Sequence, residues 1–193
     1  MAAHTAAHAA PRFNKLALNR LGLWLFMLSE TMIFIILLVT RFVLFGTGMP
    51  EGIEVDQLLG LVITILLLAS SISAYRAETA MAHGNRDAFQ RNMLLTIIMG
   101  TVFLLAVVAW EWPLAPHHGL HLQEGFGIVF FAMTGMHAFH VLTGVLMLII
   151  VYLNGRNGAY SPESYWGVEA TVKYWHFVDL VWVFFYPALY LLN

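Results

Sequence analysis

The sequence contains no cysteine, and this absence excludes several kinds of chemistry. Without a thiol the chain cannot form disulfides, thiolate nucleophiles or thiolate metal sites. The sequence also lacks a run of basic residues: its 9 lysines and arginines are dispersed, and the net charge is −2. Because nucleic-acid binding needs a clustered basic surface, we expect no nucleic-acid partner.

Charged residues of both signs are scarce. They make up 10% of the chain, whereas hydrophobic residues make up 60% and the mean hydropathy is +0.76. So few polar side chains cannot cover a water-soluble globule of 193 residues. The composition therefore predicts an integral membrane protein.

Five apolar stretches are long enough to cross a hydrocarbon core, which takes roughly 20 helical residues. They cover residues 21–45, 58–74, 93–109, 126–153 and 174–192. In lipid only helices and closed barrels satisfy their own backbone hydrogen bonds, and the alternating pattern of barrel strands is absent. We therefore expect an all-α membrane protein. Residues 1–20 would form a cytoplasmic N-terminal extension, and residues 21–193 a bundle of five transmembrane helices.

The basic residues predict the orientation of these spans. Eight of them flank the N-terminus, the second connection and the fourth connection: Arg12, Lys15, Arg20, Arg76, Arg86, Arg91, Arg156 and Lys173. Only Arg41 lies on the other side. Cytoplasmic loops carry the excess of Lys and Arg, so we expect a cytoplasmic N-terminus and an outside C-terminus. The first 20 residues lack the apolar region of a signal peptide, and we expect no cleaved leader.

Glu30 is an ionisable residue inside the first expected span. It lies about ten residues, or roughly 15 Å, from the start of that span, with no basic residue within one helical turn. An isolated charge at this depth costs several kcal/mol. The carboxyl group must therefore pair across helices, be protonated, or meet water or a lipid head group. A hydrogen-bonded tie between helices and a proton-handling role both remain open.

His137 and His140 stand three residues apart in the fourth expected span, and so on one helical face. Their spacing permits shared metal ligation, but His176 is the only other intramembrane histidine. We therefore favour a structural network in which the imidazoles hydrogen-bond across helices. The third connection carries Glu111, His117, His118, His121 and Glu124, which we interpret as a solvated loop rather than a metal site.

The last expected span begins with a polar stripe. Glu169, Lys173 and His176 are spaced at i, i+4 and i+7, so the first two can form an ion pair. Asp179 follows three residues after His176, and the stripe then gives way to aromatic residues. This pattern predicts a tie to neighbouring helices, or a shallow proton-access region, rather than a channel through the membrane.

Several segments together resemble subunit III of the haem-copper oxidases. They are LFMLSETMIF at 25–34, LLLASSISAYRAETAMAHGNR at 66–86, TGMHAFHVLTG at 134–144 and EATVKYWHFVDLVW at 169–182. They occur in the family's order, and the resemblance covers about residues 22–190. The segment KYWHFVDLVW favours the cytochrome c oxidase branch. Subunit III of a quinol oxidase and an accessory subunit of a nitric oxide reductase are alternatives.

The resemblance implies a non-catalytic accessory subunit of a proton-pumping oxidase that reduces dioxygen to water in aerobic respiration. It implies no haem or copper in this chain, because those cofactors belong to the partner subunits. The implied partners are subunit I as the main contact, subunit II, a small subunit IV and membrane lipids, in a bacterial cytoplasmic membrane.

The resemblance also suggests roles for individual residues. Glu30 matches the family's intramembrane glutamate that reacts with carbodiimides, reagents that select protonated carboxyls in apolar settings. The family's polar positions in the last two helices are matched by His137, His140, Glu169, His176 and Asp179. These matches imply structural ties, or buffering near a proton entrance, and no redox role.

The chain departs from the seven-span form of the family, because the first two helices of that form are missing. The lipid cleft of the long form is then either covered by another chain or open to the bilayer. Two other classes use similar residues. A membrane cytochrome b anchor would need histidines facing each other across a haem, which two on one helix cannot provide together. A proton-coupled transporter would use Glu30 and Asp179, but the internal repeats typical of transporters are absent.

Overall fold

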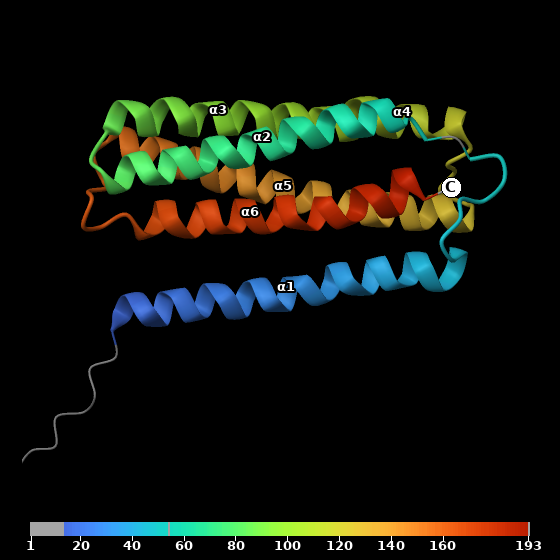
Figure 1. The fold of residues 1–193 in the computed structure, drawn as a ribbon, viewed down its shortest axis with the longest axis horizontal. Helices are drawn as coiled ribbons and strands as arrows, with labels where there is room; N and C mark the ends of the chain where they lie inside the picture. Colours follow the sequence, from blue (N-terminus) through green and yellow to red (C-terminus); the bar gives the residue numbers. More distant parts are fainter. Residues whose placement is uncertain (1–13, 54, 193) are drawn as a thin grey trace, which may run out of the picture.

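The computed structural model describes residues 14–53 and 55–192, and this part of the chain is helical (Figure 1). Its long helices are α1 (Lys15–Phe45), α2 (Gln57–Ala82), α3 (Arg86–Leu105), α5 (Gly125–Arg156) and α6 (Trp166–Tyr186). Extended pairing in the described ranges is limited to one isolated bridge between Ser161 and Ser164. The expected all-α class is confirmed for the described residues.

Three of the long helices begin next to a polar side chain that caps them. Asn14, Asp56 and Asn85 accept a backbone N–H from two or three residues further on, at 3.0, 2.9 and 3.0 Å. Each cap satisfies a donor that has no partner within the helix. The caps explain why α1 begins at Lys15 rather than at residue 21. Hydropathy marks the apolar part of a helix, whereas the cap sets where the helix starts.

The helices α3 and α6 both end in a wider π-helical turn at the same end of the molecule. The segments are Ala106–Glu111 after α3 and Pro187–Leu191 after α6. Proline has no backbone N–H to donate, which favours a local change of helix type at residue 187. After the first π-helical segment come the short α4 (Trp112–Leu114) and a 3₁₀ turn at Ala115–His118.

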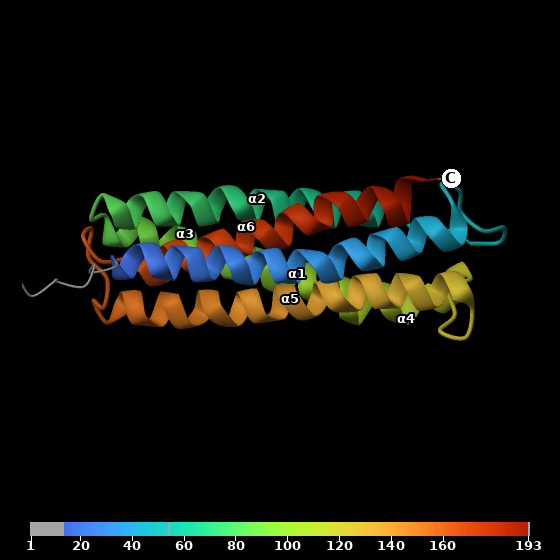
Figure 2. The same ribbon diagram turned by 90° about the horizontal axis from the view of Figure 1, so that it is seen from below.

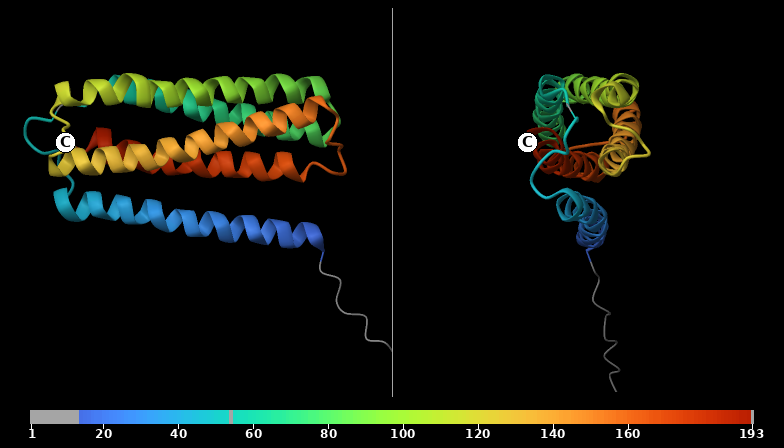
Figure 3. Two further views of the ribbon diagram at one scale, coloured as in Figure 1. Left: turned by 180° about the vertical axis from the view of Figure 1, so that it is seen from behind. Right: turned by 90° about the vertical axis from the view of Figure 1, so that its right-hand side faces the viewer.

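Helices α2, α3, α5 and α6 form a four-helix bundle, and α1 lies outside it against α5 and α6 (Figure 3). Seen from below, α1 runs along the whole length of the bundle (Figure 2). The buried residues of α1 are Met27, Phe34 and Arg41, which repeat every seven positions. The first helix is therefore attached through one narrow stripe, and most of its surface is uncovered.

The core of the bundle is built from tryptophans packed on small residues. The indole N–H of Trp175 donates to Ser70 Oγ at 2.9 Å, and that of Trp182 donates to Thr64 Oγ1 at 2.9 Å. A Cβ atom at Gly144 would lie 2.8 Å from the Trp175 ring. Small and hydroxyl-bearing residues let transmembrane helices approach closely and hydrogen-bond to one another.

Four helical segments can cross a membrane by length and composition. They are Lys15–Phe45, Gln57–Ala82, Arg86–His118 and Gly125–Arg156. The helix α6, which carries Glu169, Lys173 and Asp179, is not among these four segments of the described residues. The fifth span and the orientation of the termini therefore remain predictions. Most of the expected N-terminal extension, residues 1–13, lies outside the described residues.

Candidate functional site

Glu30 of α1 and His140 of α5 meet across the helices. His140 Nε2 lies 3.0 Å from Glu30 Oε2, and His140 Nδ1 lies 2.8 Å from the backbone oxygen of Met136. Since a carbonyl oxygen only accepts, Nδ1 carries a hydrogen and donates it to Met136. The contact between Nε2 and Oε2 then holds one proton, which either makes the histidine cationic or protonates the carboxyl group.

The surroundings of this Glu30–His140 pair are apolar. The His140 side chain is 5% exposed and that of Glu30 is 21% exposed. Phe34 packs edge-on against the imidazole, with ring centroids 4.7 Å apart. The carboxyl group borders a groove of about 360 Å³ between α1 and α5, whose lining includes Phe26, Phe139, Met147 and Tyr174. An apolar molecule in this groove can therefore contact the Glu30 carboxyl group.

Glu169 of α6 lies beside the N-terminal part of α1 and is held by two cations. Arg20 donates to it through Nε and Nη2, both at 3.0 Å, and Lys173 donates to the same carboxylate. The residue is buried, at 7% exposure. The expected Glu169–Lys173 ion pair is confirmed, and the ion pair with Arg20 is an addition that the sequence did not predict. This Glu169 cluster ties α1 to α6.

His137, His176 and Asp179 do not join a common site. His176 Nδ1 lies 2.6 Å from Ser71 Oγ of α2. In the described part of the chain, neither His137 nor Asp179 has a hydrogen-bond partner for its side chain, although both are buried. The expectation that His137 hydrogen-bonds across helices is therefore wrong there. Its ring stacks on Trp182 instead, with centroids 4.8 Å apart.

The two histidines of α5 contact different helices. His137 meets Trp182 of α6 while His140 meets Glu30 of α1, because a step of three residues places the two side chains about 60° apart around α5. Shared metal ligation is therefore not formed. Among the residues that the structure describes, no group of three metal-ligating side chains comes together.

Arg41 is a buried residue whose role sequence reasoning missed. It is 0% exposed, and its guanidinium group donates to the carbonyl oxygens of Ala188 at 3.0 Å, Gly46 at 2.9 Å and Gly48 at 3.0 Å. It also lies 4.9 Å from the centroid of the Phe126 ring. The available signal was the seven-residue spacing from Phe34, which places Arg41 on the inner stripe of α1.

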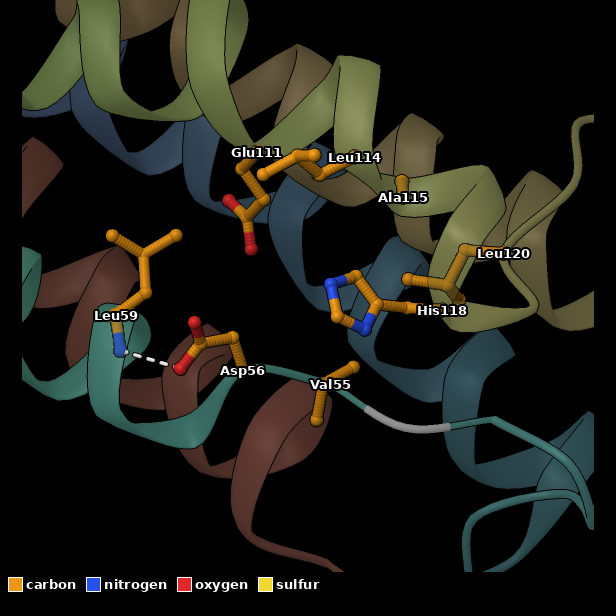
Figure 4. Close-up of a pocket in the computed structure, with 8 residues that line it drawn as sticks. All are labelled: Val55, Asp56, Leu59, Glu111, Leu114, Ala115, His118 and Leu120. Atoms are coloured by element: carbon orange, nitrogen blue, oxygen red, sulfur yellow. Dashed lines mark hydrogen bonds between the residues drawn. The ribbon is translucent and has the colours of Figure 1, made fainter.

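A smaller polar cluster closes the end of the bundle near the π-helical turns (Figure 4). Glu111, Asp56 and His118 line a cavity of about 20 Å³, enough for about one water molecule. The Tyr190 hydroxyl donates to Glu111 Oε1. Glu111 is therefore part of the packed helix end, and the expectation that it belongs to a solvated loop is wrong.

Comparison with known proteins agrees with this architecture. The family model for cytochrome c oxidase subunit III matches residues 4–193. The chain belongs to the cytochrome c oxidase subunit III family. It is 32% identical to cytochrome c oxidase subunit 3 of Thermostichus vulcanus over 191 residues, which cover 97% of this chain and 91% of that protein. It is also 32% identical to cytochrome c oxidase subunit 3 of Corynebacterium diphtheriae, with 96% and 95% covered.

The Synechocystis sp. cytochrome c oxidase subunit 3 is 33% identical over 186 residues, which cover 91% of this chain and 76% of that protein. The family resemblance read from the four sequence segments is thus confirmed. Membership makes the chain a component of a haem-copper oxidase complex.

Proposed function

We propose that this chain is a five-span accessory subunit that stabilises subunit I of a bacterial cytochrome c oxidase and supports its proton uptake. The Glu30–His140 pair carries this proposal. It holds one proton between a carboxyl group and an imidazole, at membrane depth and beside an apolar groove. A pair of this kind can tie two helices together and buffer a proton.

The arrangement of the helices supports five spans. In Figure 2, α6 and the π-helical segment that follows it run alongside the other helices over a similar length. The two carboxyl groups of α6 are covered: Glu169 by its two cations, and Asp179 by burial. With the basic residues concentrated at one end, this favours a cytoplasmic N-terminus and an outside C-terminus in the inner membrane.

The histidines support the assignment of haem and copper to the partner subunits. His137 stacks on Trp182, His140 pairs with Glu30, and His176 pairs with Ser71. An axial pair for a haem needs two imidazoles directed at one metal from opposite faces. Each of these three rings contacts a different neighbouring residue, so no two of them are arranged as an axial pair for one haem.

The test is carbodiimide labelling of the purified complex. In the wild type, Glu30 should be labelled because its contact with His140 Nε2 holds a proton and its carboxyl group borders the apolar groove. We expect Glu30→Gln to abolish labelling of this chain while the haem content stays at the wild-type level. Glu163→Gln, at an exposed loop position, is the control and should leave labelling unchanged. Loss of haem from the Glu30→Gln complex would contradict an accessory role.

A further inference from the structure

The two flanks of the molecule differ in whether their ionisable side chains at membrane depth are buried or exposed. End-on, α2 and α6 form one side of the bundle and α3 and α5 form the opposite side (Figure 3). Across residues 93–109 of α3 and the π-helical segment after it, and across residues 126–153 of α5, every exposed side chain is apolar, and the two histidines there are buried. That flank can face lipid without leaving an ionisable group uncovered.

The other flank leaves ionisable groups uncovered. A groove of about 460 Å³ runs between α1 and α6, lined by apolar residues such as Leu28 and Leu180 together with Lys173 and His176. The Lys173 side chain is 31% exposed, and His176 is half-buried. His176 lies ten residues beyond Trp166, the start of α6, and so about 15 Å along that helix. An imidazole is too short to reach the interface from there, although a lysine can.

The hydrogen-bonding groups in the groove are incompletely satisfied. Lys173 and Arg20 share one carboxylate, that of Glu169. Glu78 of α2 is close enough to interact with Lys173, but the two form no ion pair in the described part of the chain. His176 uses Nδ1 for Ser71, and its other ring nitrogen has no partner among the described residues. Lipid tails offer neither donors nor acceptors, so a lipid cover would leave this ring nitrogen and the remaining ammonium hydrogens of Lys173 unpaired.

We infer that the α1–α6 groove is the surface on which the catalytic subunit of the oxidase docks. The partner is a transmembrane helix that presents hydrogen-bond acceptors at the depth of Lys173 and a polar side chain at the depth of His176. Its acceptors complement the two cations that share Glu169, and its apolar side chains fill the space beside Leu28 and Leu180. This inference rests on the proposed function, because it names the face through which the accessory subunit meets its partner.

Site-specific photo-crosslinking in the intact complex tests the inference. A photoreactive phenylalanine analogue replaces Leu28 or Leu180 in the groove, and Ile98 or Ile150 on the α3–α5 flank. These four positions are exposed to similar extents, at 55%, 56%, 50% and 58%. We expect the two groove positions to form an adduct with the haem-bearing subunit, identified by mass spectrometry. The two control positions should give lipid adducts only.

The outcomes separate the interface from the function. Lipid adducts alone at Leu28 and Leu180, in a complex that still contains its haem subunit, would overturn the docking surface and leave the accessory role standing. An adduct with a second copy of this chain, or a haem-subunit adduct confined to Ile98 and Ile150, would also overturn it. If no haem-bearing subunit co-purifies with the wild-type chain, the proposed function fails, and the docking surface fails with it.

Discussion

The coupling between Glu30 and His140 can be measured as a free energy with a double-mutant cycle. The cycle compares Glu30→Leu, His140→Leu and the double variant with the wild type. Each single variant removes one side of a 3.0 Å contact and leaves the other side without a partner in apolar surroundings. The double variant leaves neither side unpaired. The two single losses should therefore add up to more than the loss in the double variant.

The structure limits the size of this coupling. Hydrogen bonds that involve a charged group contribute about 1.5–3 kcal/mol in proteins. Measured interhelical hydrogen bonds in a membrane protein average about 0.6 kcal/mol and reach about 1.7 kcal/mol, because alternative partners are found when the contact is lost. The Glu30 side chain is 21% exposed to a groove, but His140 is 5% exposed and cannot turn to another partner easily. We therefore expect a coupling of about 1–1.5 kcal/mol, toward the upper end of the membrane range.

The assay is SDS-induced unfolding in detergent micelles, followed by tryptophan fluorescence, for the four proteins of the cycle. Glu30→Gln is the matched control, since its amide can still donate to the imidazole Nε2, and it should lose less than about 1 kcal/mol. A coupling below about 0.3 kcal/mol would refute the reasoning that this pair joins α1 to α5. It would leave the packing of Phe34 as the main link between them.

Two further substitutions test the packing of the molecule in the same assay. Arg41→Met removes the donor for three carbonyl oxygens and should lower the free energy of unfolding by about 3–5 kcal/mol. A variant as stable as the wild type would show that relief of the desolvation of the guanidinium group offsets the lost hydrogen bonds. Gly144→Val places a Cβ 2.8 Å from the Trp175 ring and should cost about 1–3 kcal/mol. The control Gly22→Ala, where a Cβ meets nothing within 4 Å, should be neutral, and equal effects at both glycines would contradict the close contact.

The helical class was predictable because it depends on local composition and on the solvent. Long apolar stretches with no alternating pattern can only be helices in lipid, and this holds whatever their neighbours are. The starts of the helices were less well predicted, since they depend on a few capping side chains. Asn14 and Asn85 are ordinary polar residues in a sequence and become informative only when the following N–H groups are known to be free.

The candidate site was predictable by residue and only partly by partner. The i, i+4 spacing of Glu169 and Lys173 fixes their ion pair within one helix. The partner of Glu30 is 110 positions away in the sequence. Which histidine it contacts depends on how α1 packs against α5, and the local sequence does not show this. The role of Arg41 was not predictable, because nothing in its local sequence shows that a backbone oxygen of the distant residue Ala188 completes its hydrogen bonds.

The contacts of Arg41 bear on the order in which the molecule can be completed during synthesis. The first helix packs mainly on α5 and α6, the last two helices of the described chain. One carbonyl that satisfies Arg41 belongs to Ala188, close to the C-terminus. Chains are made from the N-terminus, so α1 must wait in the membrane with an incompletely bonded guanidinium until nearly the whole chain has been translated. A chain that ended before Ala188 would keep only the two local contacts of Arg41, with Gly46 and Gly48, and would leave Nε of the guanidinium group without its carbonyl partner.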